Sequence, residues 1–342
     1  MPASNVTQVP ENSVDAINPN DHRFSVAPMM DWTDRHCRWF HRLLVPDALL
    51  FTEMVTSGAI LHSDRARLLD FDVVERPVVL QLGGSEPDEM AAAVRLAEPW
   101  GYDGYDLNCG CPSDRVQRGR FGACLMREPA LVRDLLAAMR AATAREVSVK
   151  CRIGVDDCEE DAFLERFVVA CAESGVDTVV VHARKAWLQG LSPKENREKP
   201  PLRYDVVRRL KARHPELRIV LNGGLRTPAA IREARGWADG VMVGREAYQN
   251  PGALPALRAA ATATAPRPLD DGAVLRALAD HVDRKRVEGV PPAAVLRHVL
   301  GLFQGRPGAR RWRRTLSERM RDGDAAGALV FEAARGLEAR AA

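Results

Sequence analysis

The chain has 342 residues, 46% of them hydrophobic and 28% charged, and its formal net charge is +3. This is long enough for one large core and a smaller second unit. Because the net charge is small, a nucleic-acid partner would have to be held by local basic patches and not by the whole surface. No apolar run approaches the length that spans a bilayer, so a membrane protein is excluded.

The first 22 residues have neither the charged start nor the apolar middle of a secretory signal, and we interpret residues 1–22 as a disordered tail. The seven cysteines are an odd number scattered over predicted strands and helices, which indicates reduced thiols and a cytoplasmic location. Cys109 and Cys111 form a C-x-C pair without a second such pair or a close histidine pair. We therefore predict no metal site, and expect Cys109 to be a packing residue.

Eight short apolar segments follow in chain order, each rich in β-branched residues and bounded by glycine or proline. This pattern favours strands buried on both faces. The segments cover residues 25–30, 49–55, 77–84, 105–112, 147–154, 178–185, 218–224 and 240–246. Six segments between them carry apolar residues at helical spacing: 33–44, 88–100, 129–142, 159–174, 204–214 and 227–236.

Eight strands alternating with helices over about 230 residues predict a (β/α)8 TIM barrel, which we place at residues 23–260. A doubly wound sheet is the alternative, but no G-x-G-x-x-G motif follows any of the strands. After residue 251 the pattern changes to Ala- and Leu-rich helices without strands. We expect a linker at residues 262–268 and a smaller all-helical domain over residues 261–342.

Polar residues stand at the ends of six of the predicted strands, where a barrel of this kind places its active site. A single Gln, Asn or His at such a position more often satisfies loop backbone groups, but convergence from six strands indicates a site. The residues are Gln81, Asn108, Cys111, Lys150, Arg152, His182, Arg184, Asn222, Gly223, Gly224, Gly244 and Arg245.

Glycines follow the seventh and eighth strands, at Gly223, Gly224 and Gly244, and Arg245 comes next. Such loops bring backbone N–H groups close to a phosphate, and Arg245 would add a fixed charge. Together with Lys150 and nearby amide groups, they would suit flavin mononucleotide, FMN. The alternative is a plain turn with a solvated Arg245.

Lys150 has two possible roles. It could place positive charge beside the pyrimidine end of a flavin. A desolvated lysine on a barrel strand is also the nucleophile of Schiff-base aldolases, and Arg152 on the same side of the strand would help to depress its pKa. The aldolase interpretation leaves Cys111 without a role.

Seven ordered motifs together resemble the tRNA-dihydrouridine synthases, in particular the DusA-like subfamily, from about residue 23 to residue 314. They are APMMDWTDR at 27–35, NCGCPSDRVQ at 108–117, FGACLM at 121–126, VKCRIG at 149–154, HARKAWLQGLSPKENRE at 182–198, NGG at 222–224 and VGREAYQNP at 243–251. The resemblance implies a flavoenzyme that uses NADPH to reduce the C5=C6 bond of tRNA uridine, at positions 20 and 20a of the D-loop. It also implies FMN in the barrel mouth and a helical domain that grips the RNA.

By position, the family's FMN contacts fall on Pro28, Met29, Met30, Gln81, Lys150, His182, Asn222, Gly223, Gly224, Gly244 and Arg245. Its proton-donating cysteine falls on Cys111. Its tRNA contacts fall on Lys194, Arg197, Arg310 and Arg313, with the register among the arginines 310–314 left open.

The chemistry independently supports these roles. Reduction of the pyrimidine requires hydride at C6 and a proton at C5, and a cysteine thiol is neutral near pH 7 yet acidic enough to donate. We therefore interpret Cys111 as a general acid, with Asn108 and Arg152 bonded to the uracil carbonyls. NADPH would dock transiently, since no Rossmann motif exists.

The segment RPGARRWRRTLSERMR at 306–321 places four arginines around Trp312, which suits phosphate contacts and base stacking. A solvated basic helix face is the alternative for this segment alone. Two rival functions stay open: an FMN reductase of free pyrimidines or dihydroorotate, and a non-catalytic RNA-binding module. A monomer is the default expectation.

Overall fold

The computed structural model describes residue 18 and residues 20–323 and 326–337. Most of the predicted disordered tail therefore lies outside the described residues. Its last residue, His22, is buried, and its Nε2 lies 3.1 Å from a carboxylate oxygen of Glu146 at the start of a barrel strand. The last predicted residue of the tail therefore packs against the barrel.

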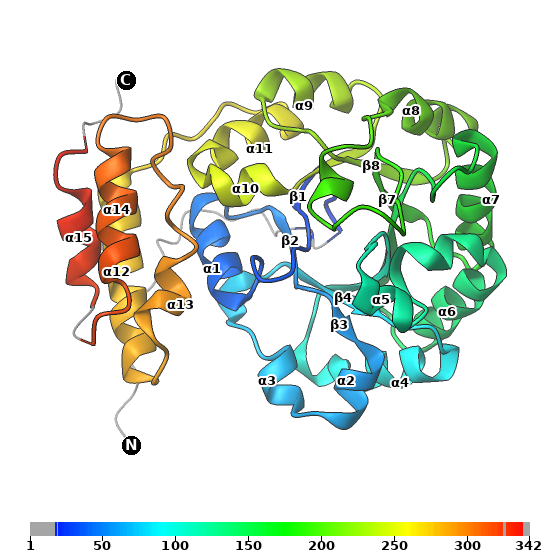
Figure 1. Cartoon of the computed structure of the whole chain (residues 1–342), viewed down its shortest axis with the longest axis horizontal. Coiled ribbons are helices and arrows are strands. Elements are labelled where there is room, and N and C mark those ends of the chain that lie inside the picture. Colours follow the sequence, from blue (N-terminus) through cyan, green and yellow to red (C-terminus); the bar gives the residue numbers. More distant parts are fainter. Residues whose placement is uncertain (1–17, 19, 324–325, 338–342) are drawn as a thin grey trace.

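Parallel strands close into a barrel with helices outside it (Figure 1). β1 pairs with both β2 and β9, and β2 pairs with β4, so the ring has no open edge. The predicted (β/α)8 fold is confirmed; the additional strand β3 is a two-residue extension beside β4. The strands are β1 (Phe24–Val26), β2 (Leu49–Phe51), β3 (Val55–Thr56), β4 (Val78–Gly83), β5 (Gly104–Cys109), β6 (Glu146–Arg152), β7 (Thr178–His182), β8 (Arg218–Asn222) and β9 (Gly240–Val243).

All six predicted helices are present, and proline or a capping side chain marks several of their starts. In α9 the Thr227 side chain accepts from the N–H of Ala230, and Pro228 occupies the first position. The α-helices are α1 (Arg35–Leu44), α2 (Ser57–His62), α3 (Arg65–Leu69), α4 (Pro87–Ala97), α5 (Asp114–Arg118), α6 (Pro129–Ala141), α7 (Glu160–Glu173), α8 (Tyr204–Arg213), α9 (Pro228–Arg235), α10 (Arg245–Gln249), α11 (Leu254–Thr262), α12 (Asp271–Val287), α13 (Pro292–Leu296), α14 (Ala309–Arg319) and α15 (Ala328–Ala334).

The barrel interior contains a separate apolar cluster, which consists of Ala27, Leu49, Phe51, Val79, Val180, Val220 and Met242. Side chains alternate along a strand, so the residue two positions further on points to the same side. From Val79, Val180 and Val220 this rule leads to Gln81, His182 and Asn222. The apolar cluster therefore forms the floor beneath the polar residues of the mouth.

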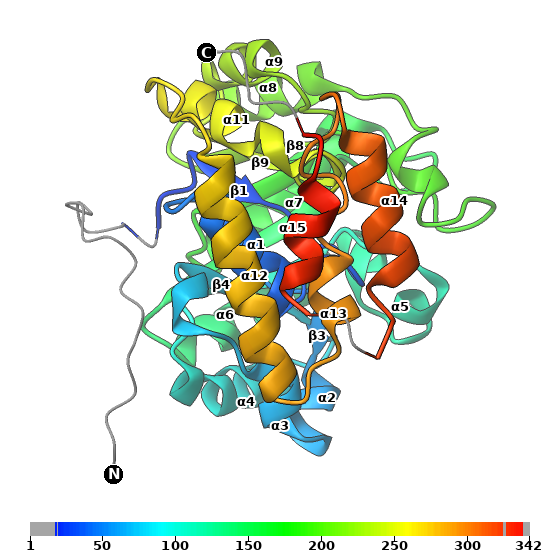
Figure 2. The ribbon, with the colours of Figure 1, turned by 90° about the vertical axis from the view of Figure 1, so that its left-hand side faces the viewer.

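The carboxyl-terminal helices α12 to α15 pack beside the barrel, where α12 and α13 contact α1 and α15 packs on α12 and α14 (Figure 2). The rings of Trp39 and His281 stack at 3.6 Å. Asp34, at the start of α1, accepts hydrogen bonds from Arg297 and His298. Burial acts to raise the pKa of Asp34, but the hydrogen bond and charge of His298, together with the hydrogen bonds from the Cys37 N–H and Arg297, hold that pKa below its usual value.

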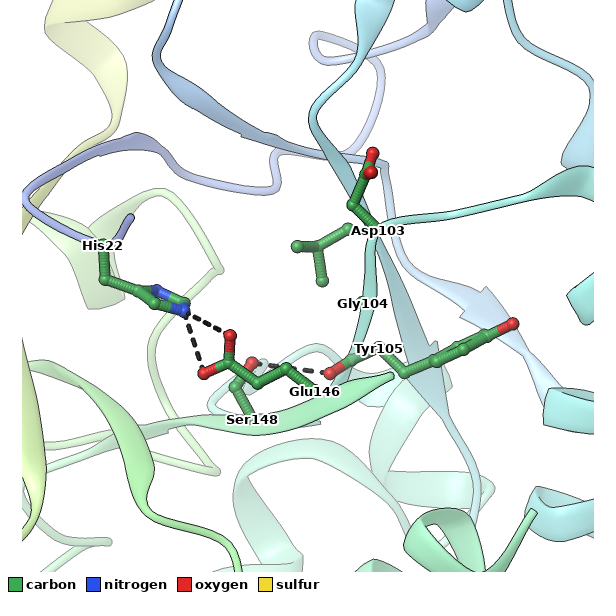
Figure 3. A pocket seen from close by; sticks show the side chains of 7 residues that line it. His22, Asp103, Gly104, Tyr105, Glu146 and Ser148 are labelled. Atoms are coloured by element: carbon green, nitrogen blue, oxygen red, sulfur yellow. Dashed lines mark hydrogen bonds and ion pairs between the residues drawn. The ribbon is translucent and has the colours of Figure 1, made fainter. Parts of the chain in front are cut away.

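The amino-terminal end of the barrel is closed by a polar cluster around Glu146 (Figure 3). Its carboxylate is bonded to His22, Thr178 and Arg218. The cluster lies at the end of the barrel opposite to the mouth, because Glu146 is the first residue of β6.

Candidate active site

The Cys111 turn follows β5 at the mouth. Asn108 Oδ1 accepts hydrogen bonds from the backbone N–H groups of Gly110, at 3.1 Å, and Cys111, at 3.0 Å. The thiol of Cys111 is partly exposed and donates to Ser113 Oγ at 3.5 Å. Cys109 is fully buried, so its predicted packing role is confirmed. The turn thus presents one sulfur to the mouth and buries the other.

Two polar residues below this turn escaped the sequence analysis. Asp106 and Ser148 are buried, and Ser148 Oγ donates to Asp106 Oδ1 at 2.8 Å. Gln81 Nε2 donates to Asp106 Oδ2 at 2.7 Å, and Asn108 Nδ2 donates to Gln81 Oε1 at 2.8 Å. The only signal in the sequence was that Asp106 stands two residues before Asn108, and hence on the same side of the strand.

Lys150 and His182 lie on the neighbouring strands β6 and β7. Burial, and then the nearby Arg152 guanidinium, lower the pKa of Lys150 to about 8, although Asp106 opposes this shift. Burial and the same cations lower the pKa of His182 well below its usual value. Near pH 7 the site therefore holds a lysine that is mainly cationic beside a neutral imidazole.

Arg152 is almost fully buried, and its guanidinium joins two loops. Nε donates to the carbonyl of Gly110 at 3.0 Å, while Nη1 donates to the carbonyls of Lys185, at 3.1 Å, and Asn196, at 2.8 Å. In this structure Arg152 therefore fixes the Cys111 turn to the loop after β7. Its predicted bond to a uracil carbonyl stays a prediction.

The glycine loops follow β8 and β9. Gly223 and Gly224 have φ values of 109° and 71°, which only glycine adopts readily. Asn222 Nδ2 donates to the carbonyl of Met242 at 2.7 Å and so ties the two strands together. Around Gly244 there is room, since a Cβ atom there would have its nearest neighbours at 3.8 Å and 3.9 Å.

Arg245 begins α10 and is partly buried in an ion pair. Its Nη1 lies 2.7 Å from Glu198 Oε1, and its Nη2 donates to the carbonyl of Arg197 at 2.9 Å. Arg184 lies near enough to Arg245 for each charge to be felt by the other. Positive charge from Arg184 and Arg245 thus lies close to the loop after β9.

The Pro28–Met30 turn completes the mouth after β1. The N–H of Met29 donates to Thr33 Oγ1 at 2.8 Å, and the Met29 side chain packs on the apolar floor. The Met30 side chain is 53% exposed. Met29 therefore holds the turn against the apolar floor of the barrel, while the Met30 side chain is exposed to solvent.

The loop after β7 carries Lys194 and Arg197, both exposed. Between them Asn196 is fully buried, and its side chain bonds to the backbone N–H and C=O of Trp187. The loop is thereby held from inside while its two cationic side chains face outward.

On α14, Arg310, Arg313, Arg314 and Ser317 line an open hollow of about 380 Å³. Trp312 points the other way: it is fully buried, its Nε1 donates to the carbonyl of Val299 at 3.0 Å, and it packs edge-on against Phe303. The expectation that this tryptophan stacks on bases is wrong, because the helical period that exposes its neighbours turns it inward.

The mouth loops and α14 lie on the same side of the molecule. Figure 1 shows both in front, and Figure 2, turned by 90°, shows α14 and α5 toward the same edge. No helix in the described part of the chain is long and apolar enough to cross a membrane. Within the same residues, no group of three or more His, Cys, Asp or Glu is placed to hold a metal ion.

A barrel with a thiol, a buried lysine and glycine loops converging on one mouth defines a TIM-barrel enzyme. The family model described as "Dihydrouridine synthase (Dus)" matches residues 25–335. The chain belongs to this family of tRNA-modifying oxidoreductases, as the sequence predicted.

Relatives named tRNA-dihydrouridine(20/20a) synthase cover most of the chain. The protein from Xanthomonas axonopodis pv. citri is 56% identical over 296 residues, 86% of this chain and 88% of that protein. The one from Yersinia pestis is 52% identical over 313 residues, 91% of this chain and 90% of that protein. A solved 2-naphthoyl-CoA reductase complex covers 71% of this chain and 50% of its own, with TM-score 0.53 and 10% identity, and supports the fold alone.

Proposed function

We propose that this chain is a cytoplasmic tRNA-dihydrouridine synthase that reduces uridines 20 and 20a of the D-loop with NADPH, through bound FMN. The relatives' shared name supports the substrate and positions. The observation that carries the chemistry is the partly exposed Cys111 thiol, held on a fixed turn at the rim of the mouth.

The residues of the mouth fit a flavin phosphate and ring. Gly244 leaves space beside its backbone for a phosphate, Gly223 and Gly224 supply the positive-φ turn after β8, and Arg245 adds positive charge next to Gly244. Lys150 supplies a cation on the opposite wall. When bound, the flavin would supply the hydride.

Cys111 performs the proton transfer in this proposal. As hydride reaches C6 of the uracil, the S–H bond breaks and the proton goes to C5, which leaves a thiolate that solvent reprotonates. Asn108 orients the turn through the Cys111 N–H and so fixes the direction of donation. The target base would have to leave its stack to enter the mouth.

Replacing Cys111 with Ala tests this role. NADPH should still reduce the flavin at the wild-type rate, whereas dihydrouridine formation should fall by about 100-fold or more. Cys124→Ala is the control, since this second partly exposed cysteine donates to the carbonyl of Phe121 and should leave both rates unchanged. Equal slowing of both half-reactions in the Cys111 variant would contradict the general-acid role.

The rival functions separate in one experiment. Unmodified tRNA should reoxidise the NADPH-reduced enzyme, whereas free uridine should not. Reoxidation by free uridine would indicate a small-molecule reductase, and a colourless protein that cannot be loaded with FMN would indicate a binding module.

A further inference from the structure

One buried carboxylate has no place in the proposed chemistry. Asp106 is fully buried, and both its partners are neutral: Gln81 Nε2 donates to one oxygen and Ser148 Oγ to the other. The charge of the nearby Lys150 offsets part of the cost of burying this carboxylate, but burial still raises its pKa. A carboxylate at this position therefore calls for a reason other than stability.

A continuous series of hydrogen bonds connects Asp106 to the Cys111 turn. An ionised carboxylate can only accept, so the Gln81 amide must turn its NH2 group toward it. Gln81 Oε1 then faces Asn108 Nδ2, and Asn108 Oδ1 faces the N–H groups of Gly110 and Cys111. We call these bonds, from Asp106 through Gln81 and Asn108 to the turn, the amide chain.

Reversing either amide breaks the amide chain. A reversed Gln81 would oppose its oxygen to the carboxylate of Asp106. A reversed Asn108 would oppose its NH2 group to the two backbone N–H groups of the turn, and two hydrogen bonds would be lost. Only one orientation of the two amides satisfies every group.

We propose that Asp106 is a positioning residue whose side-chain oxygen, by accepting from Gln81, fixes the orientation of the Gln81 and Asn108 amides and thereby holds the turn that presents the Cys111 thiol. The proposal rests on the proposed function only for the use made of that thiol. The geometry of the turn is independent of it.

Three variants separate this role from general packing. Asp106→Leu removes the acceptor at similar size. Asp106→Asn keeps the acceptor, because the amide oxygen of the new side chain can face Gln81 while its NH2 group donates to Ser148. The Ser148 hydroxyl can then donate to the Tyr105 carbonyl, which lies 3.5 Å away (Figure 3). Ser148→Ala is the matched control, since it removes the other bond to the same carboxylate and leaves the amide chain intact.

The first measurement needs no activity. Iodoacetamide alkylation of Cys111 is followed by site-resolved mass spectrometry, with Cys124 as internal reference. Asp106→Leu should change the ratio of the two rates by about fivefold or more, because the turn loses its fixed orientation. Asp106→Asn and Ser148→Ala should stay within about twofold of wild type.

The second measurement is reoxidation of the reduced enzyme by saturating tRNA, at about pH 6.5, where Lys150 stays charged. Asp106→Leu should lower kcat by roughly tenfold or more with little change in KM, because a misplaced donor slows the chemical step. Asp106→Asn should restore the rate to within about threefold.

Two outcomes overturn the proposal. One is an equal rate of Cys111 alkylation in Asp106→Leu and Ser148→Ala; the other is an Asp106→Asn protein whose alkylation rate and kcat change as much as those of Asp106→Leu. If the leucine variant does not fold, Gln81→Leu interrupts the amide chain one residue further on. An unchanged Cys111 alkylation rate in that variant would also overturn it. Altered alkylation in a protein without tRNA activity would count against the proposed function alone.

Discussion

At the residue scale, the buried carboxylate of Asp106 makes the stability of the folded protein depend on pH. Burial raises its pKa to about 6, and the hydrogen bonds from Gln81 and Ser148 only partly oppose that rise. In the unfolded chain the same carboxyl titrates near 3.8. Between these two values the folded protein holds a proton that the unfolded chain has released, so the free energy of unfolding falls as pH rises through this window.

Asp106→Asn should therefore stabilise the protein, and more so at pH 7 than at pH 4. The difference between the folded and unfolded pKa of Asp106 corresponds to a loss of about 3 kcal/mol at most in the free energy of unfolding. This loss is complete only above the folded-state pKa. Urea unfolding of both proteins at the two pH values measures it. A gain of the same size at pH 4 and pH 7 would show that the carboxylate is not ionised at a cost in the folded state.

The glycine loops matter at the scale of elements. Gly224 needs its positive φ, and a Cβ atom there would lie 2.4 Å from Leu202 Cδ1 and 2.8 Å from the Tyr204 hydroxyl. Gly244 has φ −110°, and a Cβ atom there meets only ordinary contacts. The fold therefore requires glycine at position 224, whereas Gly244 leaves space beside its backbone for a ligand.

Alanine at the two positions should give different defects. Gly224→Ala should lower the melting temperature of the flavin-free protein by a few degrees, because the backbone is strained. Gly244→Ala should leave that temperature unchanged but weaken FMN binding by about tenfold or more, since its methyl group enters the space expected for the phosphate. Differential scanning fluorimetry and flavin titration measure the two effects. Unweakened FMN binding by Gly244→Ala would place the phosphate elsewhere.

At the scale of the whole molecule, the docking of the helical domain on α1 decides where its arginines face. Asp34 joins the start of α1 to Arg297 and His298, and the Trp39–His281 stack fixes the same interface. As a result, α14 and the mouth share one side of the molecule, and one RNA could contact both.

Arg310 and Arg313 should contribute phosphate contacts on that side. Replacing both with Ala should weaken tRNA binding and reduce the slope of log K against log salt by about 1 to 2, with flavin content unchanged. Arg208→Ala with Arg232→Ala is the control, as these exposed arginines lie on the outer barrel helices α8 and α9. Filter binding over a salt series measures the slopes, and equal slopes for the two double variants would refute the contact.

The sequence by itself determined the barrel, because eight β-branched segments between helical patterns can bury their apolar faces in few other ways. It also identified the family, since the seven motifs contain the residues of the mouth. It did not predict α2 and α3, which follow the extension β3, because they are too short for a helical period to stand out.

Only the tertiary structure decided which polar residues contact one another. Asp106 and Ser148 come from different strands, and their place beneath Cys111 depends on strand register. Arg152 joins the loop after β5 to the loop after β7, and Trp312 faces inward because the helix is docked on that side. The local sequence pattern determines the helices and strands, but contacts between distant segments arise only when the barrel closes and the carboxyl-terminal helices pack against it.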